Sequence, residues 1–243
     1  PLFRTQYLLE PLMGGGGFFS SQQRAQMQGE HSRRRSLEQG KVYVAGVDIA
    51  GEAEEGEDEA LRSAKPRRDS TVVTIGELDF TQCDELMPEP TIRIVEQYWW
   101  TGQSHASLFP RLVDVLRNLW RCRRVVVDAT GLGQGVASFL ERSLGKGVVT
   151  PFAFTSQSKS RLAFDLLAAV NSGRVKVYAA DGSPEFQEFC AQMDSAVGHF
   201  RANETMNFYV DPRQGHDDFL MSLALLVKAG EYQPRSARGR IAV

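Results

Sequence analysis

The sequence RVVVDATGLGQGVA at residues 124–137 contains the strongest fold signal in the chain. Its first five residues form a short apolar run ending in Asp128, which is typical of a strand buried on both faces of a sheet. The glycines that follow predict a tight turn that opens a helix over residues 131–144. A buried strand that leads directly into a helix indicates an α/β protein.

Further strands and helices are expected on both sides of this stretch. Three β-rich segments joined by polar loops precede it and predict an antiparallel meander, at residues 41–49, 70–78 and 91–100. Apolar spacing predicts a helix at 104–120, after which strands and helices alternate. The later expected strands are 148–154, 174–178 and 207–210, and the later helices are 159–171, 183–195 and 215–229. We therefore predict an α/β mixed sheet, three antiparallel strands followed by parallel strands, with helices on both faces.

The composition limits the class of protein. Over 243 residues the formal net charge is −2, so any DNA binding must come from a local basic patch. No apolar run approaches the roughly 18 residues that span a bilayer, and the first residues lack the order of a secretory signal, which predicts a soluble, intracellular protein. The three cysteines are scattered, which argues against structural zinc and a disulfide framework.

Composition also predicts the domain boundaries. Residues 14–40 are rich in Gly, Gln, Ser and Arg, which is typical of a linker or mobile arm. Their glycine run lacks the Lys followed by Ser or Thr of a P-loop. We expect an arm at 1–40, one domain at 41–230 and a flexible tail at 231–243. Residues 51–69 are predicted to be a solvated loop that carries many acidic residues.

Acidic residues occur at three element ends. Asp48 ends the first β-rich segment (GVDIA), Asp128 ends the apolar strand, and Asp217 and Asp218 (GHDDFL) open the last helix. Ligands of open α/β sheets bind at strand carboxyl ends, so these side chains can converge. Clustered carboxylates suit Mg²⁺ or Mn²⁺, and two such ions can activate water and stabilise the leaving oxygen of a phosphodiester. Each Asp alone can also be a turn or cap residue, but acids in all three places favour a shared metal site.

Two other enzyme classes fit the sequence less well. The glycines after Asp128 are similar to a dinucleotide-binding turn, but Val136 occupies the third glycine position and an Asp precedes the turn. A tight turn under Asp128 explains these glycines. A Ser/His/Asp hydrolase is poorly supported because none of the four histidines accompanies a Gly-x-Ser-x-Gly turn.

The order of the motifs carries a more specific resemblance. The segments GVDIA, DSTVV, RVVVDATGLGQGVA, FTSQSKSRL and GHDDFLMSLAL follow one another between residues 42 and 229. This order resembles the nuclease domain of the large terminase subunit of tailed bacteriophages and prophages. The leading FRTQYLLEPL looks like the joint that follows the packaging ATPase in that family. The resemblance implies an RNase H-like fold over 41–230, and an arm at 1–40 that follows an ATPase domain absent from this chain.

The resemblance also implies an activity, a metal-dependent endodeoxyribonuclease that cuts concatemeric double-stranded DNA during packaging with two Mg²⁺ or Mn²⁺ ions. Asp48 would bridge both ions, Asp128 and Asp218 would hold one each, and Asp217 would be a direct or an outer ligand. The implied partners are double-stranded DNA, the packaging ATPase domain, the portal and the small terminase subunit. No membrane is implied, and the expected location is the host cell cytoplasm.

Several further residues are candidates for the same site. Asp69, His216 and Lys159 are possible supporting residues, and Lys159 could hold the scissile phosphate. Candidate contacts to DNA phosphates are Arg33, Arg34, Arg35, Lys65, Arg67, Arg68, Lys159 and Arg161. Each of these also has an interpretation as an ordinary loop, helix-end or surface residue. Trp99 and Trp100 can stack on bases, although at least one is expected in the core.

Two alternatives remain open at the level of sequence. One is another RNase H-like nuclease, of the Holliday-junction resolvase type, whose acidic residues would look alike. The other is a non-catalytic module that docks on the portal or on DNA. The acidic loop at 51–69 departs from the family pattern, because negative charge beside a DNA groove weakens binding. It either folds away or regulates access.

Overall fold

The centre of the molecule is a six-stranded mixed sheet with strand order β5-β4-β1-β2-β3-β6. The computed structural model describes residues 17–50, 70–83, 88–131, 133–201 and 204–233. The strands of the sheet are β1 (Val42–Asp48), β2 (Ser70–Asp79), β3 (Thr91–Thr101), β4 (Arg124–Asp128), β5 (Val149–Phe152) and β6 (Val175–Val177). The helices are α2 (Ser21–Met27), α4 (His105–Val113), the π-helix η1 (Asp114–Leu119), α5 (Gly133–Leu144), α6 (Ser156–Asn171), α7 (Pro184–Ser195) and α8 (Asp218–Ala229).

Strand pairing follows the predicted order. Strands β1, β2 and β3 pair antiparallel with their sequence neighbours. Strand β4 runs parallel to β1, β5 runs parallel to β4, and β6 runs parallel to β3. The predicted mixed sheet is therefore confirmed, and β1 and β4 have their carboxyl ends at the same edge, as parallel neighbours must.

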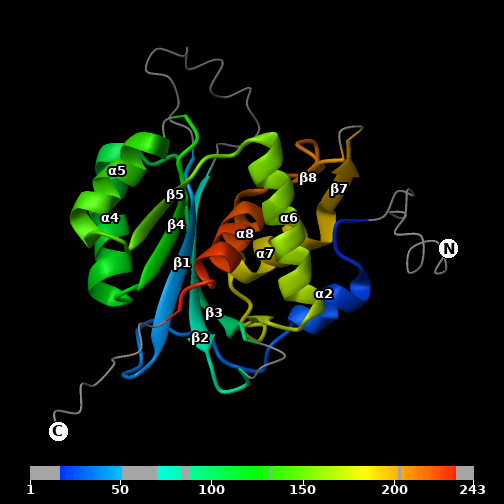
Figure 1. Ribbon diagram of the computed structural model, residues 1–243, viewed down its shortest axis with the longest axis horizontal. Helices are drawn as coiled ribbons and strands as arrows, with labels where there is room; N and C mark the ends of the chain where they lie inside the picture. The colour runs from blue at the N-terminus through cyan, green and yellow to red at the C-terminus, as the bar shows by residue number, and fades with distance from the viewer. Residues whose placement is uncertain (1–16, 51–69, 84–87, 132, 202–203, 234–243) are drawn as a thin grey trace, which may run out of the picture.

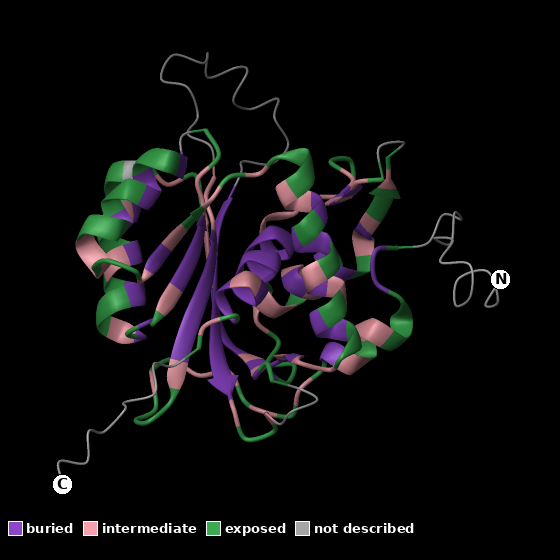
Figure 2. Ribbon diagram, viewed as in Figure 1, coloured by how far each residue is buried: buried purple, intermediate pink, exposed green. Residues whose placement is uncertain are grey.

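The sheet lies between two layers of helices (Figure 1). Helices α4, η1 and α5 pack on one face against Tyr43, Ala45 and Val47 of β1. Helices α6, α7 and α8 pack on the other face, where they meet Val44. Nearly every residue of α8 is buried, as its purple ribbon shows (Figure 2). We call the second face the α8 face.

A glycine in β1 allows α8 to lie unusually close to the sheet. A Cβ atom at Gly46 would collide with the Ser222 carbonyl oxygen and the Leu226 amide of α8. The Ser222 hydroxyl donates to the Gly46 carbonyl oxygen at 3.0 Å and lies 2.8 Å from the Thr74 hydroxyl. These contacts fix the helix against β1 two residues before the strand ends.

Residues 17–40 correct the prediction of a mobile arm. Helix α2 has a complete capping box between Ser20 and Gln23, and Phe18, Phe19 and Met27 are buried in the core of the α8 face. Isolated β-bridges join Gly17 to Val197 and Gln28 to Val177. The overall polar composition of the segment concealed these few apolar anchors, which are enough to pack it onto the domain.

Two further elements differ from expectation. The helix predicted at 104–120 changes to π-helical bonding at Asp114, where η1 begins. The helix predicted at 183–195 is followed directly by a strand, β7 (Ala196–Phe200), which pairs antiparallel with β8 (Met206–Val210) in a separate hairpin. The sequence of β7, AVGHF, lacks the alternating apolar pattern on which strand prediction depends.

Some predictions lie outside the described residues. Asp69, Lys65, Arg67 and Arg68 belong to the segment 51–69, and most of the predicted tail, from residue 234, also lies there. In the described part of the chain, the structure contains no helix of the length and apolar character needed to cross a bilayer.

Candidate functional site

Two of the predicted carboxylates lie side by side at the carboxyl edge of the sheet. Because Val47 of β1 pairs with Val127 of β4, the next residues, Asp48 and Asp128, end the two strands at the same level. Side chains alternate along a strand, and Val44 and Val126 point into the α8 face. Asp48 and Asp128 are even-numbered like these valines, so both project toward α8.

Helix α8 supplies the third acidic position. Asp218 lies one helical turn before Ser222, which contacts Gly46, so Asp218 occupies the same side of the helix. The strand continues from Gly46 to Asp48 on the same face, which brings Asp218 and Asp48 together. Among the neighbouring carboxylates, Asp218 has the largest effect on the charge of Asp48.

Electrostatic interactions connect the four carboxylates. Burial raises the pKa of Asp48 well above its usual value. The negative charges of Asp218, Asp128 and Asp217 raise the same pKa further, in that order. Burial also raises the pKa of Asp128, although its hydrogen bonds from Thr130 oppose the change. We call Asp48, Asp128, Asp217 and Asp218 the carboxylate site.

Lys159 projects from the second turn of α6 toward the carboxylate site. Burial lowers the pKa of Lys159, while the charges of Asp217 and Asp48 work in the opposite direction. The ammonium nitrogen lies 6.0 Å from the ring centroid of Phe154 and 5.5 Å from that of Phe208. Lys159 thus interacts with the acids of this edge, and Asp217 is the acid that affects it most.

The turn after β4 holds Asp128 in place. The Asp128 carboxylate accepts a hydrogen bond from the Thr130 amide at 2.8 Å, and the Thr130 hydroxyl accepts one from the Phe154 amide at 3.0 Å. Gly131 adopts a positive φ of 56°, and a Cβ atom at Gly133 would collide with the Asp128 carbonyl oxygen. The prediction that these glycines serve a tight turn under Asp128 is therefore confirmed.

Helix α8 is capped by a residue from another helix. Asp217 occupies the N-cap position, but its side chain makes no capping hydrogen bond. Instead, the side-chain oxygen of Gln192, in α7, accepts hydrogen bonds from the amides of Phe219 at 2.9 Å and Leu220 at 3.2 Å. Gln192 is only 3% exposed. Sequence analysis missed it, because a glutamine inside a helix carries no signal of a contact 27 residues away.

The donor set of the carboxylate site suits a hard divalent cation. All four acids offer oxygen ligands, which Mg²⁺ and Mn²⁺ prefer. In the described ranges, however, no three His, Cys, Asp or Glu side chains are gathered closely enough to hold an ion as they stand. These oxygen donors are of the type that a hard cation prefers, but the carboxylates would have to move closer together to hold one.

Other predicted residues have mixed outcomes. His216 is half-buried and next to Asp217 in the chain, and Arg161 is exposed on α6. Trp99 packs edge-on against Phe219 with ring centroids 5.6 Å apart, while Trp100 packs against the core of the opposite face. The expectation that at least one tryptophan belongs to the core is confirmed.

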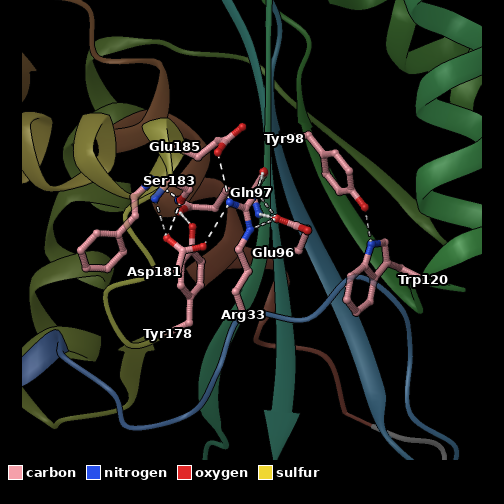
Figure 3. Close-up of polar contacts among 10 residues, drawn as sticks. Arg33, Glu96, Gln97, Tyr98, Trp120, Tyr178, Asp181, Ser183 and Glu185 are labelled. Atoms are coloured by element: carbon pink, nitrogen blue, oxygen red, sulfur yellow. Dashed lines mark hydrogen bonds and ion pairs between the residues drawn. The ribbon is translucent and has the colours of Figure 1, made fainter.

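Arg33 and Arg34 are structural ion-pair residues, which corrects their prediction as phosphate contacts. Arg33 lies 2.5 Å from Glu96, 3.4 Å from Asp181 and 3.1 Å from Glu185, and Figure 3 shows these carboxylates around its guanidinium group. Arg34 pairs with the fully buried Glu77. Only Arg35 of the three is exposed. We call Arg33, Glu96, Asp181 and Glu185 the Arg33 cluster.

Comparison with known proteins supports the fold assignment. No family model and no curated protein matches the sequence. Among solved structures, the large terminase nuclease of thermophilic phage G20c with bound magnesium is 20% identical, with a TM-score of 0.63 over 88% of this chain and 98% of that chain. The nuclease domain of large terminase subunit gp2 of bacterial virus Sf6 is 7% identical, with a TM-score of 0.55 over 90% of this chain and all of that chain.

A longer protein also matches. The large terminase of bacteriophage HK97 is 14% identical, with a TM-score of 0.51 over 95% of this chain but 47% of that chain. Together with the mixed sheet and its two helical layers, these likenesses confirm the fold that the order of the sequence motifs predicts. The chain has the RNase H-like fold of phage large terminase nuclease domains.

Proposed function

We propose that this chain is the metal-dependent endonuclease domain of a viral large terminase, which cuts concatemeric double-stranded DNA during genome packaging. The observation that carries the proposal is that three carboxylates, one at the end of β4 and two at the start of α8, act on the buried Asp48 at the end of β1. Carboxylates held close together repel one another, and a bound divalent cation relieves that repulsion. The likeness to terminase nucleases adds support, since structures of the G20c nuclease contain bound magnesium, cobalt and zinc.

Each carboxylate has a distinct place in the proposed site. Two divalent ions bound there would activate a water molecule and stabilise the leaving oxygen of a phosphodiester. Asp48 interacts with both Asp128 and Asp218, so it would be the residue to contact both ions, with Asp128 and Asp218 contacting one each. Among the acids that act on Lys159, Asp217 has the largest effect, which favours a supporting place for Asp217. Lys159 would help hold the phosphate group against the carboxylates.

The proposed substrate and partners follow from the same assignment. The substrate is double-stranded DNA, and the partners are a packaging ATPase domain in the full-length chain, the portal and the small terminase subunit, in the host cell cytoplasm. The match to just under half of the HK97 large terminase is consistent with a nuclease region that accompanies another domain.

The test is plasmid nicking and linearisation in Mn²⁺, Mg²⁺ and EDTA. We expect metal-dependent cutting that falls by more than about 100-fold in Asp48→Asn and Asp128→Asn, beyond the usual cost of removing an outer partner of a metal ligand. Asp218→Asn should lose more activity than Asp217→Asn. Asp114→Asn, which makes the same chemical change in η1 on the opposite face, is the matched control.

The outcomes separate the alternatives. Equal cutting by the parent and the Asp48→Asn and Asp128→Asn variants would overturn the carboxylate mechanism. A parent that binds DNA but does not cut it would favour a docking module. Rapid cutting of a four-way junction, with little cutting of plain duplex, would favour a resolvase-type nuclease.

A further inference from the structure

A small cavity lies beside the carboxylate site, between the start of α6 and the β7–β8 hairpin. Its volume is about 120 Å³, which corresponds to a few water molecules. Its lining comes from the segment that enters α6 and from the hairpin: Phe154, Thr155, Ser156, Lys159, Arg201, Met206 and Asn207. We call it the Arg201 pocket.

The Arg201 pocket has the opposite charge to the carboxylate site. Two of its lining residues, Lys159 and Arg201, are cationic, and Asn207 adds an amide. None of the described residues that line it is acidic. Lys159 belongs to both places, because it lines the pocket and also interacts with Asp217 and Asp48. Lys159 would therefore separate a ligand in the pocket from the acids of the carboxylate site.

The cationic groups are held in position. The Arg201 guanidinium donates to the Ser156 hydroxyl at 3.0 Å, and this bond uses one of its five N–H donors. The Arg201 amide donates to the Thr205 carbonyl oxygen at 2.8 Å, which ties the residue into the hairpin. The rings of Phe154 and Phe208 flank the Lys159 ammonium. Such a fixed pair of cations beside an amide is suited to a tetrahedral anion with several acceptor oxygens.

We propose that the Arg201 pocket binds a backbone phosphate of the DNA strand, adjacent to the phosphate that is cut, through Arg201 and Asn207, with Lys159 shared between the two phosphates. The inference rests on the proposed nuclease function for the identity of the DNA strand. A contact on the neighbouring phosphate fixes the direction in which the strand crosses the carboxylates, and it carries no base sequence information. The hairpin, which the sequence analysis only half detected, thereby gains a place in substrate binding.

The test measures binding without metal, so that it does not depend on cutting. A short fluorescein-labelled duplex is titrated in EDTA with the parent, Arg201→Gln, Asn207→Val and the control Arg142→Gln, which is exposed on α5 on the opposite face. We expect Arg201→Gln to weaken binding about tenfold at low salt and to make the salt dependence shallower by about one phosphate contact. Asn207→Val should weaken binding less and leave the salt slope unchanged. Arg201→Lys should restore the slope but only part of the affinity.

The results of this test separate a failure of the pocket assignment from a failure of the proposed nuclease function. Parent-like affinity and salt slope in Arg201→Gln would overturn the pocket assignment, even if the parent cuts DNA. The expected loss of binding, together with a parent that never cuts, would retain the pocket and overturn the nuclease. Inorganic phosphate alone, followed by ³¹P line broadening, tests the other source of this ligand. Broadening that Arg201→Gln abolishes, with unchanged duplex affinity, would show a free-phosphate site and overturn the DNA assignment.

Discussion

Two clusters of acidic side chains in the described part of the molecule have their charges balanced in different ways. In the Arg33 cluster, one guanidinium group lies within 2.5 to 3.4 Å of all three carboxylates. Burial opposes the charge on Arg33, yet its acidic partners raise its pKa overall. The pKa of Asp181 is lowered, because hydrogen bonds from Ser183 and Arg33 outweigh burial. Glu96 keeps a raised pKa, because burial outweighs the effect of Arg33.

The charges of the carboxylate site act on one another in a different way. Asp48 has three acidic neighbours, and the cation that acts on it is Lys159, whose own pKa is lowered by burial. An acidic cluster with its own arginine can stabilise the fold by itself, whereas a cluster that keeps its repulsion is suited to a cation from outside. The difference supports the proposal that the Arg33 cluster is structural and the carboxylate site is functional.

The largest expected effect on stability is the loss of the structural cation. Arg33→Met would leave Glu96, whose side chain is 6% exposed, buried without its partner. We expect the free energy of unfolding in urea to fall by about 2 to 3 kcal/mol, somewhat below the usual cost of breaking a buried pair because the Arg33 side chain is partly exposed. The control is Arg213→Met, since Arg213 pairs with Asp211 on the surface. A similar, negligible loss in both variants would contradict the structural role.

The second prediction concerns the effect of divalent ions on stability. Binding to the carboxylate site should stabilise the parent by about 2.7 kcal/mol when the free ion exceeds its dissociation constant 100-fold. Asp48→Asn should lose this gain and, in EDTA, should unfold at a higher temperature than the parent because it removes repulsion. Arg33→Met should keep the full metal response. Thermal unfolding with and without Mn²⁺ checks all three, and a metal response that survives in Asp48→Asn would contradict the site.

The sheet and the carboxylate site could be predicted because their signals are local. The apolar run that ends in Asp128 forms a strand buried on both faces, and the alternation that places Val44 in the core also orients Asp48. Because ligand sites of α/β sheets lie at strand carboxyl ends, two aspartates at such ends were sufficient to place the proposed site. The choice between Asp217 and Asp218 required the position of Ser222 against Gly46, which sequence does not contain.

The features that were missed depend on contacts between distant segments. Arg33 belongs to a run of three arginines, a pattern that also suits phosphate binding. Only its position against Glu96 and Glu185 makes it structural. The arm at 17–40 packs through a few buried side chains within a polar sequence. Gln192 acquires its role from the end of α8, not from its own helix. In each case tertiary structure, and not local propensity, decides what the residue does.

The third prediction tests whether Gln192 positions the acids of α8. Gln192→Met removes the acceptor oxygen at nearly constant shape, so we expect a loss of about 1 kcal/mol of stability, as for other helix caps. The apparent affinity for Mn²⁺ should also fall, because the first turn of α8 carries Asp217 and Asp218. The control, Gln187→Met, changes an exposed glutamine of the same helix.

A double exchange distinguishes positioning from simple packing. The Gln192 amide group donates to Glu188 at 3.0 Å, so Gln192→Glu combined with Glu188→Gln keeps both the hydrogen bond and the acceptor for α8. We expect the exchanged protein to recover Mn²⁺ affinity. If Gln192→Met loses stability while its Mn²⁺ affinity matches that of the parent, Gln192 is a structural cap only.

The smallest expected effect is a pH dependence of stability that arises from His31, two residues before Arg33 in the chain. His31 lies 2.8 Å from the Ile94 carbonyl oxygen of β3, and burial, aided by the charges of Arg93 and Arg34, lowers its pKa in the folded protein. The unfolded chain therefore takes up a proton first as the pH falls. Stability from neutral His31 is fully present above its ordinary pKa of 6.5 and is lost as the pH falls toward the lowered value.

Comparison of the parent with His31→Gln isolates this contribution, because glutamine can donate to the same carbonyl oxygen but does not titrate. Between pH 8 and pH 5, the unfolding temperature of the parent should fall relative to that of the variant. The carboxylates of the carboxylate site contribute equally to both proteins, so they cancel in the difference. If the difference in unfolding temperature between parent and variant stays constant with pH, His31 has the same pKa in the folded and the unfolded protein. The contact between His31 and the Ile94 carbonyl oxygen would then make no pH-dependent contribution to stability.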